Sequence, residues 1–248
     1  IIPTLNRPKI LKETLDSIVE QSIQPEEIII IDQSRDIKTK ELCEQYKTVQ
    51  YIHSEIKSSS IARNIGIEQS SAEILFFLDD DIELMKDYFR IIIETYEEKD
   101  VVAVQGWIKN SERFNSIGNL IRKLFLFEYD SNEKKILPNF LGTNFKRKPT
   151  SNQNIQWCNG CGFSVKAEIA KKEKFEKHFF LYSLAEDRDF SFRALKHGKV
   201  LLNPKAEMIH KVVDIARLPT EKKTRMIYVH QMYLISKNFV RTFKTSFC

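Results

Sequence analysis

The sequence predicts an α/β fold in which a mainly parallel sheet has helices on both faces. Short apolar runs at residues 27–31 and 74–78 have the length and branched content of buried strands, and residues 49–53 are expected to form a further short strand. Segments with apolar residues at helical spacing separate these runs. Strands that alternate with helices at this rhythm are typical of parallel sheets. The predicted order is the end of a strand at 1–2, a helix at 8–22, strand 27–31, a helix at 36–47, strand 49–53, a helix after Ser58-Ser59-Ser60, strand 74–78, helix 86–98 and strand 101–107.

The second half of the chain has a weaker pattern. We expect an insertion or a mobile loop at 109–154, because long irregular loops are commonly functional or disordered. Within it, residues 117–127 favour a helix and 137–153 are rich in Pro, Asn and Lys. Further strands are predicted at 163–165, 200–202 and 208–213, and a helix at 186–196 that Gly198 ends. This organisation gives four parts: 1–108, 109–154, 155–218 and 219–248.

The last part, from Pro219 onward, has the pattern of one long amphipathic helix. Two kinds of contact suit it: packing on the domain core, and binding to an anionic bilayer surface. The two roles are compatible. The apolar stripe is Tyr228, Met232, Ile235, Phe239 and Phe243, and the opposite, basic stripe is Lys237, Arg241 and Lys244.

Composition excludes several classes of protein. The chain has 248 residues, of which 42% are apolar and 29% charged, as in a globular domain with a full core. A net charge of +5 permits an anionic ligand but does not argue for nucleic acid. No stretch reaches the length of a bilayer-spanning helix and no signal peptide is recognisable. The first residue is Ile within an apolar run, which indicates a trimmed chain.

The four cysteines favour a reducing, cytoplasmic setting. Cys158 and Cys161 have the spacing of a redox or zinc pair, but Cys43 and Cys248 do not form the second pair that a zinc site would need. We therefore expect four reduced thiols.

Three consecutive carboxylates, Asp79, Asp80 and Asp81, follow the apolar run 74–78. Like charges at adjacent positions repel, whereas a hard divalent cation such as Mg²⁺ or Mn²⁺ is held by carboxylate oxygens and shares its other sites with phosphates. Ligands of open α/β sheets bind outside the carboxyl ends of the strands, where this triplet falls. We expect a solvent-facing metal site here. The alternative is a solvated acidic turn.

Other polar residues also follow predicted strands. Thr4 and Arg7 follow the first strand and Asp32 follows the second, which suits a nucleotide lying across the strand ends. Ordinary turn chemistry is the alternative. Arg63, early in the helix before the triplet, can offer a planar cation to a diphosphate, or form a surface ion pair.

Two later segments are further candidates for a binding site. Trp157 precedes a turn with Gly160 and Gly162, and either stacks on a sugar or packs in the core. Glu186-Asp187-Arg188-Asp189 opens a helix, where carboxylates favour the helix dipole and Asp189 can pair with Arg193.

Taken in this order, the motifs resemble those of inverting glycosyltransferases of family 2, which have the GT-A fold and use nucleotide-sugar donors. The likeness covers most of the chain outside 109–154. It rests on Ile-Ile-Pro-Thr-Leu-Asn-Arg at 1–7, Ile-Ile-Ile-Ile-Asp-Gln-Ser at 28–34, Ala-Arg-Asn-Ile-Gly-Ile at 62–67 followed by Leu-Asp-Asp-Asp at 78–81, and Glu-Asp-Arg-Asp-Phe-Ser-Phe-Arg at 186–193.

The resemblance implies a role for each matching residue. It implies Asp187 as the general base, with Glu186 as its rival, and Mg²⁺ or Mn²⁺ as the cofactor. It further implies a glycan or lipid-linked acceptor, a role in cell-envelope polysaccharide or glycolipid synthesis, and a cytoplasmic location with peripheral contact to the inner face of the membrane. Substrate binding falls to Pro3, Thr4, Arg7, Asp32, Arg63, Asp79, Asp80, Gly160 and Glu186, and metal binding to Asp79, Asp81 and His210.

Three other classes of protein use some of the same features. A phosphatase that forms an aspartyl phosphate places its Asp-x-Asp after the first strand, not the fourth. A sugar-nucleotide nucleotidyltransferase would want a glycine-rich phosphate loop, and Pro3 to Arg7 has no glycine. A catalytically silent nucleotide-sugar-binding domain remains the third alternative.

Overall fold

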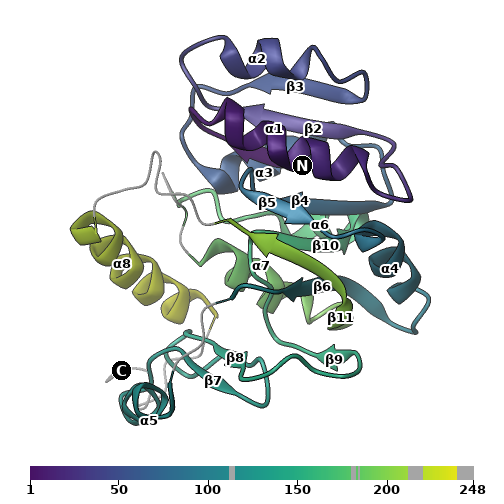
Figure 1. Ribbon diagram of the computed structural model, residues 1–248. Coiled ribbons are helices and arrows are strands. Elements are labelled where there is room, and N and C mark those ends of the chain that lie inside the picture. Colours follow the sequence, from purple (N-terminus) through teal and green to yellow (C-terminus); the bar gives the residue numbers. More distant parts are fainter. Residues whose placement is uncertain (112–114, 180–182, 184, 212–219, 239–248) are drawn as a thin grey trace.

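The computed structural model describes residues 1–111, 115–179, 183, 185–211 and 220–238. It confirms the alternation of strands and helices in the first half of the chain. β1, β2 and β3 pair in parallel, with Ile30 of β2 opposite Ile2 on one side and Tyr51 on the other. The elements, at the top of Figure 1, are β1 (Ile2–Thr4), α1 (Pro8–Val19), β2 (Ile28–Asp32), α2 (Lys38–Cys43), β3 (Val49–His53), α3 (Ser59–Gln69) and β4 (Ile74–Leu78).

The buried strands feed two hydrophobic cores, one on each face of the sheet. Alternate side chains of a strand point to opposite faces, so Leu78 joins the core under α1 while Leu75 and Phe77 join the other. Leu11, Leu15 and Ile18 of α1 are almost fully buried because their helical spacing places them on one stripe. The prediction of strands buried on both faces is therefore confirmed.

The second half of the sheet is mixed rather than parallel. Its strand order is β4-β10-β6-β11-β5, in which only the β6–β11 pair is parallel. β10 runs antiparallel between β4 and β6, so the prediction of a mainly parallel sheet holds for the N-terminal strands alone. The elements are β5 (Ile82–Leu84), α4 (Tyr88–Thr95), β6 (Val101–Ile108), β10 (Gly162–Lys166), α6 (Ala167–Glu173), α7 (Glu186–Ala194) and β11 (Lys199–His210).

β11 corrects the prediction of two separate strands at 200–202 and 208–213. It is one strand whose register against β6 shifts between Asn203 and Glu207. Pro204 lies in that interval, and proline within a sheet is confined to edges and bulges because it donates no backbone hydrogen bond. The strand therefore continues past the proline as far as His210. Residues 212 and 213 lie outside the described part.

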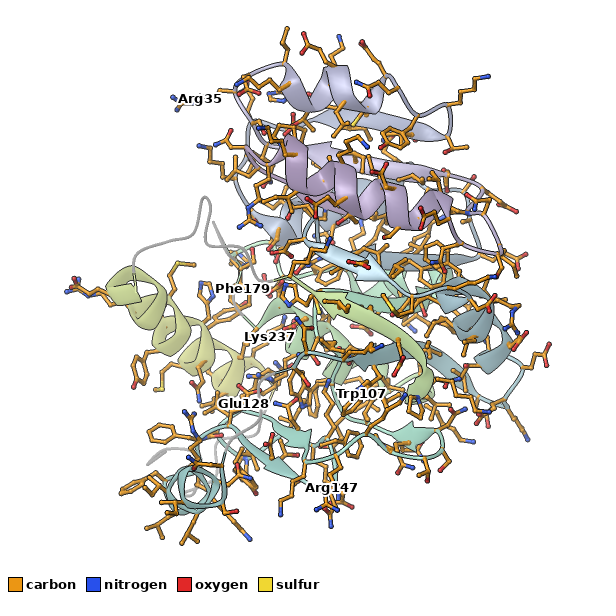
Figure 2. The ribbon with its side chains drawn as sticks, in the orientation of Figure 1. Arg35, Trp107, Glu128, Arg147, Phe179 and Lys237 are labelled. Atoms are coloured by element: carbon orange, nitrogen blue, oxygen red, sulfur yellow. The ribbon has the colours of Figure 1, made fainter. Side chains whose placement is uncertain are left out.

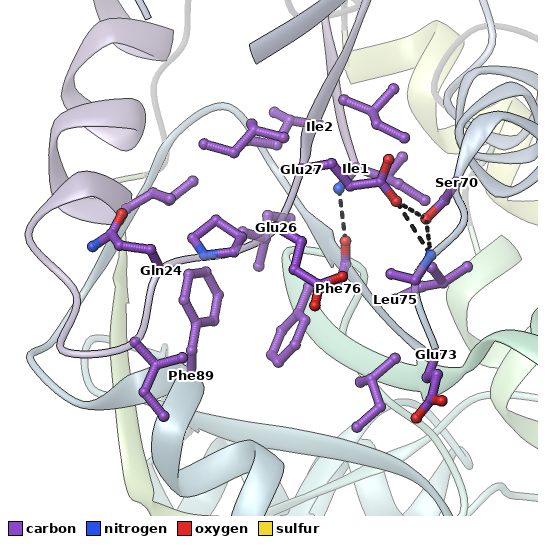
Figure 3. A pocket seen from close by; sticks show the side chains of 18 of the residues that line it. Ile1, Ile2, Gln24, Glu26, Glu27, Ser70, Glu73, Leu75, Phe76 and Phe89 are labelled. Carbon is purple, nitrogen blue, oxygen red and sulfur yellow. Dashed lines mark hydrogen bonds between the residues drawn. The ribbon is translucent and has the colours of Figure 1, made fainter. Parts of the chain in front are cut away.

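Backbone hydrogen bonds of Ile1 join the two halves of the sheet. Its amino group donates to the carbonyl of Phe76 at 2.9 Å, and its carbonyl accepts from the N–H of Leu78 at 3.1 Å. Beside Ile1, a largely apolar cavity of about 510 Å³ is lined by the first residues of β2 and β4 (Figure 3). It lies at the opposite end of these strands from Asp32 and Asp79, so we place no functional site there.

The segment 109–154 contains more regular structure than the sequence predicts. It holds the expected helix, α5 (Ser116–Leu124), and three short strands: β7 (Tyr129–Ser131), β8 (Thr143–Phe145) and β9 (Gln153–Asn154). β7 and β8 pair in parallel at the bottom of Figure 1, and β9 adds to β11. The segment is thus an appendage of the sheet.

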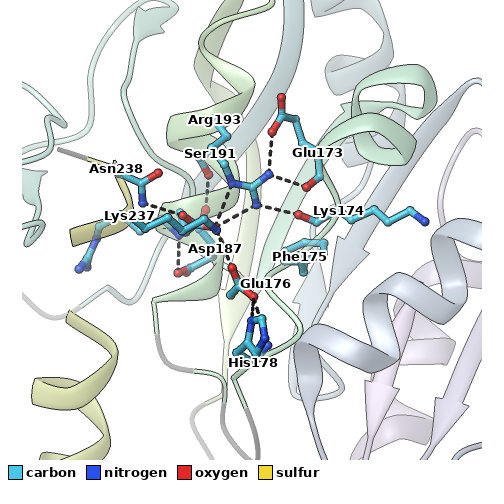
Figure 4. Close-up of polar contacts among 12 residues, drawn as sticks. Glu173, Lys174, Phe175, Glu176, His178, Asp187, Ser191, Arg193, Lys237 and Asn238 are labelled. Carbon is cyan, nitrogen blue, oxygen red and sulfur yellow. Dashed lines mark hydrogen bonds and ion pairs between the residues drawn. The ribbon is translucent and has the colours of Figure 1, made fainter. Parts of the chain in front are cut away.

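α8 (Thr220–Asn238) packs on the domain, but not with the predicted stripes. Ile235 is buried as expected, whereas Tyr228 and Met232 are about 60% exposed. Lys237, predicted to face away from the core, lies between α8 and the sheet (Figure 2) and donates to Glu176 at 2.7 Å and to Asp189 at 3.0 Å. Figure 4 shows this network, to which Asn238 and Arg193 also contribute. Asp189 is a buried carboxylate that water does not solvate, so it needs a cationic partner close by. This need draws Lys237 towards the domain.

Phe239, Arg241, Phe243 and Lys244, the other residues of the predicted stripes, lie outside the described residues. Among the helices that the structure does describe, none has the combination of length and apolar content that crossing a bilayer requires.

Candidate active site

A triad of metal-ligand type forms where β4, β5 and β11 meet. One ligand atom each from Asp79, Asp81 and His210 lies within 4.8 Å of the others. β11 pairs antiparallel with β5, so His210 comes to lie opposite Ile82, next to the triplet. His210 Nε2 is 3.0 Å from Asp81 Oδ1. Two carboxylates and an imidazole are ligand types that Mn²⁺ accepts, so the donor set fits a divalent cation.

Asp81 corrects the expectation of a solvent-facing triplet. It is only 3% exposed, because the chain turns back into β5 directly after it. Burial lowers the pKa of His210, but hydrogen bonds to Asp81 and Cys161 outweigh burial and raise the pKa to about 11. The positive ring of His210 balances the buried carboxylate of Asp81, and a cation bound by the triad would take the place of this proton, because imidazole ligates a metal in its neutral form.

Asp80, the middle carboxylate, points away from this triad. Thr4 Oγ1 donates to its Oδ2 at 2.6 Å, and Arg7 Nη1 donates to its Oδ1 at 3.0 Å. Burial raises the pKa of Asp80 to about 6, against the opposing effects of Thr4 and Arg7. The structure thus brings Thr4 and Arg7 to the triplet. It supports the turn after β1 as a wall of the same site.

Asp32 and Pro3 take separate positions. Asp32 is fully buried at the end of β2, where Ser34 donates to Oδ1 and Tyr51 donates to Oδ2 at 3.0 Å. Pro3 is half-buried in β1, opposite Ile31. Both lie near the carboxyl ends of their strands, but the residues that Asp32 and Pro3 contact in the ways just described are not members of the triplet.

Arg63 connects the triplet to α7. Its guanidinium is 97% or more out of solvent and donates to Asp79 at 2.9 Å, to Glu186 at 2.6 Å and to the Gly160 carbonyl at 3.1 Å. It is therefore not a surface ion pair. Burial and the nearby charge of Asp187 raise the pKa of Glu186, and Arg63 opposes this rise. Desolvation lowers the pKa of Arg63, but Glu186 and Asp79 outweigh it, so the guanidinium stays charged.

Asp187 lies beside the same turn. Its Oδ2 accepts from the backbone N–H of Gly160 at 2.7 Å, and its side chain is partly exposed. Asp187 also lines a cavity of about 280 Å³ with Glu128, Trp157, Arg188 and Gln231 among its walls. A partly exposed carboxylate in the wall of a cavity is positioned to accept a proton from a bound hydroxyl.

Trp157 and Lys134 explain the shape of this turn. Trp157 is 2% exposed and lies between two cations, Lys134 at 4.1 Å and Arg188 at 4.7 Å from its ring. It is a core residue rather than an exposed stacking platform. Lys134 donates to the side chains of Gln105 at 2.8 Å and of Asn159. Sequence reasoning missed Lys134, because it lies in an irregular segment with no periodicity to mark it as buried.

The cysteines carry no chemistry of their own here. Cys43, Cys158 and Cys161 are buried free thiols, and burial raises the pKa of Cys43 and of Cys158 to about 12. A thiol with such a pKa is a poor nucleophile and metal ligand. Cys248 lies outside the described residues.

Comparison with known proteins decides the family. The sequence model described as "Glycosyl transferase family 2" matches residues 1–173. The chain belongs to this family. The match spans the triplet and the Gly160 turn but ends before α7. Glu186 and Asp187 are therefore candidate site residues because of the geometry described above, and not because of the family match.

Curated relatives of this glycosyl transferase family 2 chain are distant. An uncharacterized glycosyltransferase of Rickettsia felis is 31% identical over 105 residues, which are 41% of this chain and 17% of the relative. Glycosyltransferase AglE of Haloferax volcanii is 29% identical over 138 residues, or 50% of this chain and 45% of the relative. The chain thus spans less than half of either protein.

Solved structures agree with the GT-A fold. GalNAc-T7, solved with UDP, GalNAc and Mn²⁺, aligns over 92% of this chain and 47% of its own, with a TM-score of 0.69 and 17% identity. The mannosyltransferase PcManGT from Pyrobaculum calidifontis, solved with GDP-Man and Mn²⁺, aligns over 97% of this chain and 64% of its own, with a TM-score of 0.64 and 14% identity. At these identities the likeness shows the fold alone.

Proposed function

We propose that this family 2 chain transfers a sugar from a nucleotide diphosphate-sugar to an acceptor hydroxyl, with inversion at the anomeric carbon. One observation carries the proposal: Arg63 and the Gly160 turn hold the Asp79–Asp81–His210 triad and the Asp187 carboxylate side by side. The proposed donor-binding site and the proposed proton acceptor thereby adjoin one another. Single displacement needs both and no covalent nucleophile.

We assign the divalent cation to Asp79, Asp81 and His210, and infer Mn²⁺ rather than Mg²⁺. An imidazole nitrogen beside two carboxylates suits the softer ion, and Mn²⁺ accompanies the nucleotide in both solved relatives described above. When bound, the cation neutralises negative charge on the leaving diphosphate. Arg63 supplies a fixed positive charge to the same region.

The nucleoside is assigned to the carboxyl ends of β1 and β2. Asp32 faces the nucleobase, with Pro3 beside it, and Asp80 approaches the ribose. Thr4 and Arg7 act through Asp80, because both donate to its carboxylate and hold its orientation. Their loss is expected to weaken donor affinity by displacing Asp80.

The acceptor hydroxyl is assigned to the cavity that Asp187 lines. Inversion requires a base on the face opposite the leaving group, and Asp187 takes the proton as the hydroxyl attacks. Glu186 is less suited to this role, since Arg63 already donates to it at 2.6 Å. We infer that the acceptor is a glycan or a lipid-linked molecule used in cell-envelope polysaccharide or glycolipid synthesis. We also infer that the protein acts in the cytoplasm, at the inner face of the membrane.

The test is a pair of nearly isosteric variants, Asp187→Asn and Glu186→Gln. With a working acceptor, release of nucleoside diphosphate should fall by roughly two to four orders of magnitude in Asp187→Asn, the usual effect of losing a general base. Donor affinity with Mn²⁺, measured by calorimetry, should stay near that of the wild type. The larger loss in Glu186→Gln would give the role of base to Glu186.

Two results would replace the proposal. Donor binding without turnover across a broad panel of acceptors would indicate a catalytically silent nucleotide-sugar-binding domain. Release of pyrophosphate from a nucleoside triphosphate and a sugar phosphate would indicate a nucleotidyltransferase.

A further inference from the structure

α5 presents an apolar face that nothing in the described structure covers. None of its residues is buried. The exposure is not that of scattered surface residues, because consecutive turns of one helix contribute to it and Phe125 and Phe127 extend it beyond the helix end. The exposed side chains are Ile117 (74%), Leu120 (69%), Ile121 (52%), Leu124 (76%), Phe125 (64%) and Phe127 (46%).

The fold fixes this face outward. The side chain of Asn119 exchanges two hydrogen bonds with the backbone of Asp130 in β7. At 3.6 residues a turn, Asn119 lies on the opposite side of the helix from Ile117, Ile121 and Leu124. The helix ends with Leu126 at φ 55°, where the N–H of Phe127 bonds to the carbonyl of Arg122 at 2.8 Å. At this end the carbonyl of Leu126 also accepts from the side chain of Asn139 at 2.5 Å, so contacts at both ends hold the apolar face away from the domain.

The charged side chains of α5 itself are of one sign. Residues 115–127 contain no acidic residue, and the two charged side chains are Arg122 and Lys123 in the last turn. They lie towards the Asn119 side of the helix, as cations do when the apolar face of a helix enters a bilayer and its polar face meets the headgroups. Six apolar side chains are also few for a stable dimer, which needs roughly 20 to 30 residues on each partner.

We propose that the apolar face of α5 binds the surface of an anionic lipid bilayer, with Arg122 and Lys123 at the headgroups. Helix α8, for which the sequence allowed both core packing and membrane binding, packs on the domain and has its Lys237 paired with Glu176 and Asp189. Figure 2 draws α5 at its lower left, and Glu128 lies between that helix and α8.

This docking surface adjoins the proposed active site. Glu128 follows Phe127 directly and lines the cavity that contains Asp187. An acceptor hydroxyl carried on a lipid of a bilayer bound by α5 would therefore lie close to the cavity that contains Asp187. This consequence rests on the proposed function. Membrane binding itself does not depend on catalysis.

The test is co-sedimentation of the full chain with vesicles of phosphatidylcholine, alone or mixed with phosphatidylglycerol. The wild type should sediment with the mixed vesicles and be released by high salt, which screens the charge attraction. The double variant Leu120→Gln, Leu124→Gln should lose at least ten-fold in binding. Both positions are exposed, so the fold should be retained. The matched control, Val229→Gln with Met232→Gln on the exposed side of α8, should bind as the wild type does.

Several outcomes would overturn the proposal. These are equal binding by the α5 variant and the wild type, wild-type protein that stays in the supernatant, and equal sedimentation with neutral and mixed vesicles. A wild-type dimer in light scattering that the α5 variant abolishes would give the face to a second copy. Calorimetric binding of UDP and GDP with Mn²⁺, run on every variant, reports separately on the proposed function.

Discussion

The backbone N–H of Gly160 donates a hydrogen bond to Oδ2 of Asp187 at 2.7 Å. The bond fixes one oxygen of the proposed base and leaves Oδ1 to the start of α7, where the N–H of Arg188 donates to it. The Gly160 carbonyl accepts from Arg63, so the backbone of a single residue bonds to both the donor side and the acceptor side. The position of Asp187 is thus set by backbone geometry.

A Gly160→Ala variant should lower turnover without unfolding the protein. A Cβ at this position would lie 3.3 Å from Arg63 Nη2 and from Asp187 Cβ and Oδ2. These atoms must yield by a few tenths of an ångström, and misplacement of about 1 Å can cost 10²-fold in rate. We expect kcat to fall by roughly ten- to a hundred-fold, with unchanged donor affinity. Steady-state kinetics and calorimetry measure the two quantities, and a normal kcat would show that the turn does not position the base.

An Asp81→Asn variant should lose the metal-dependent part of nucleotide binding. Asp81 is buried, and the near-isosteric amide keeps the packing while removing the charge that a cation needs. Calorimetry of UDP and GDP with Mn²⁺ should give the affinity that the wild type shows in EDTA. Affinity in the variant that still rises on adding Mn²⁺ would remove Asp81 from the metal site.

Local patterns in the sequence predict the strands but not their directions. The apolar runs at 27–31 and 74–78 identify buried strands because burial on both faces requires an unbroken run. Whether β10 runs parallel or antiparallel to β4 depends on how the chain crosses the sheet between them, and residues 109–154 give no periodic signal for that path. The same segment conceals Lys134, whose burial follows from tertiary packing alone.

The site was predictable to a similar extent. The carboxylates of Asp79 and Asp81 follow a strand and could be found locally, while His210 needed the resemblance to connect it to them. Arg63 was predicted to offer its cation to a diphosphate or to form a surface ion pair, and its bond to Glu186, which joins positions 123 residues apart, could not be foreseen. The exposure of α5 also could not be read from its helical periodicity, which an amphipathic core helix would share.

A Lys237→Met variant should loosen α8. Lys237 and Asn238 both donate to Asp189, which is fully buried (Figure 4). Losing a hydrogen bond to a buried charged group costs on the order of 1–3 kcal/mol. Limited proteolysis and the unfolding midpoint in urea measure the change. Arg225→Met is the matched control on the same helix, since Arg225 forms an exposed pair with Glu221 and should have little effect. Equal behaviour of the two variants would mean that the Lys237 contacts do not hold the helix.

Lys134 should make stability depend on pH in the alkaline range. Its ammonium group is 3% exposed and has amide oxygens and the Trp157 ring as partners. Burial disfavours the cation and lowers its pKa from 10.5 to about 8. Between these two values the unfolded chain binds more protons than the folded one, so this group makes the free energy of unfolding rise with pH. The gain is complete above 10.5 and lost as pH falls through 8.

The difference in unfolding free energy between the wild type and a Lys134→Met variant isolates this effect from other groups that titrate in the same range. The wild type should gain on the variant as pH rises from 8 to 10.5. Denaturant titrations at several pH values measure the difference. Lys135→Met is the control, because the side chain of Lys135 is 54% exposed and its difference from the wild type should stay flat in this window. A flat difference for Lys134→Met as well would mean that Lys134 keeps the pKa of a solvated lysine, and that the turn bearing Asn159 and Gly160 is not built around a buried cation.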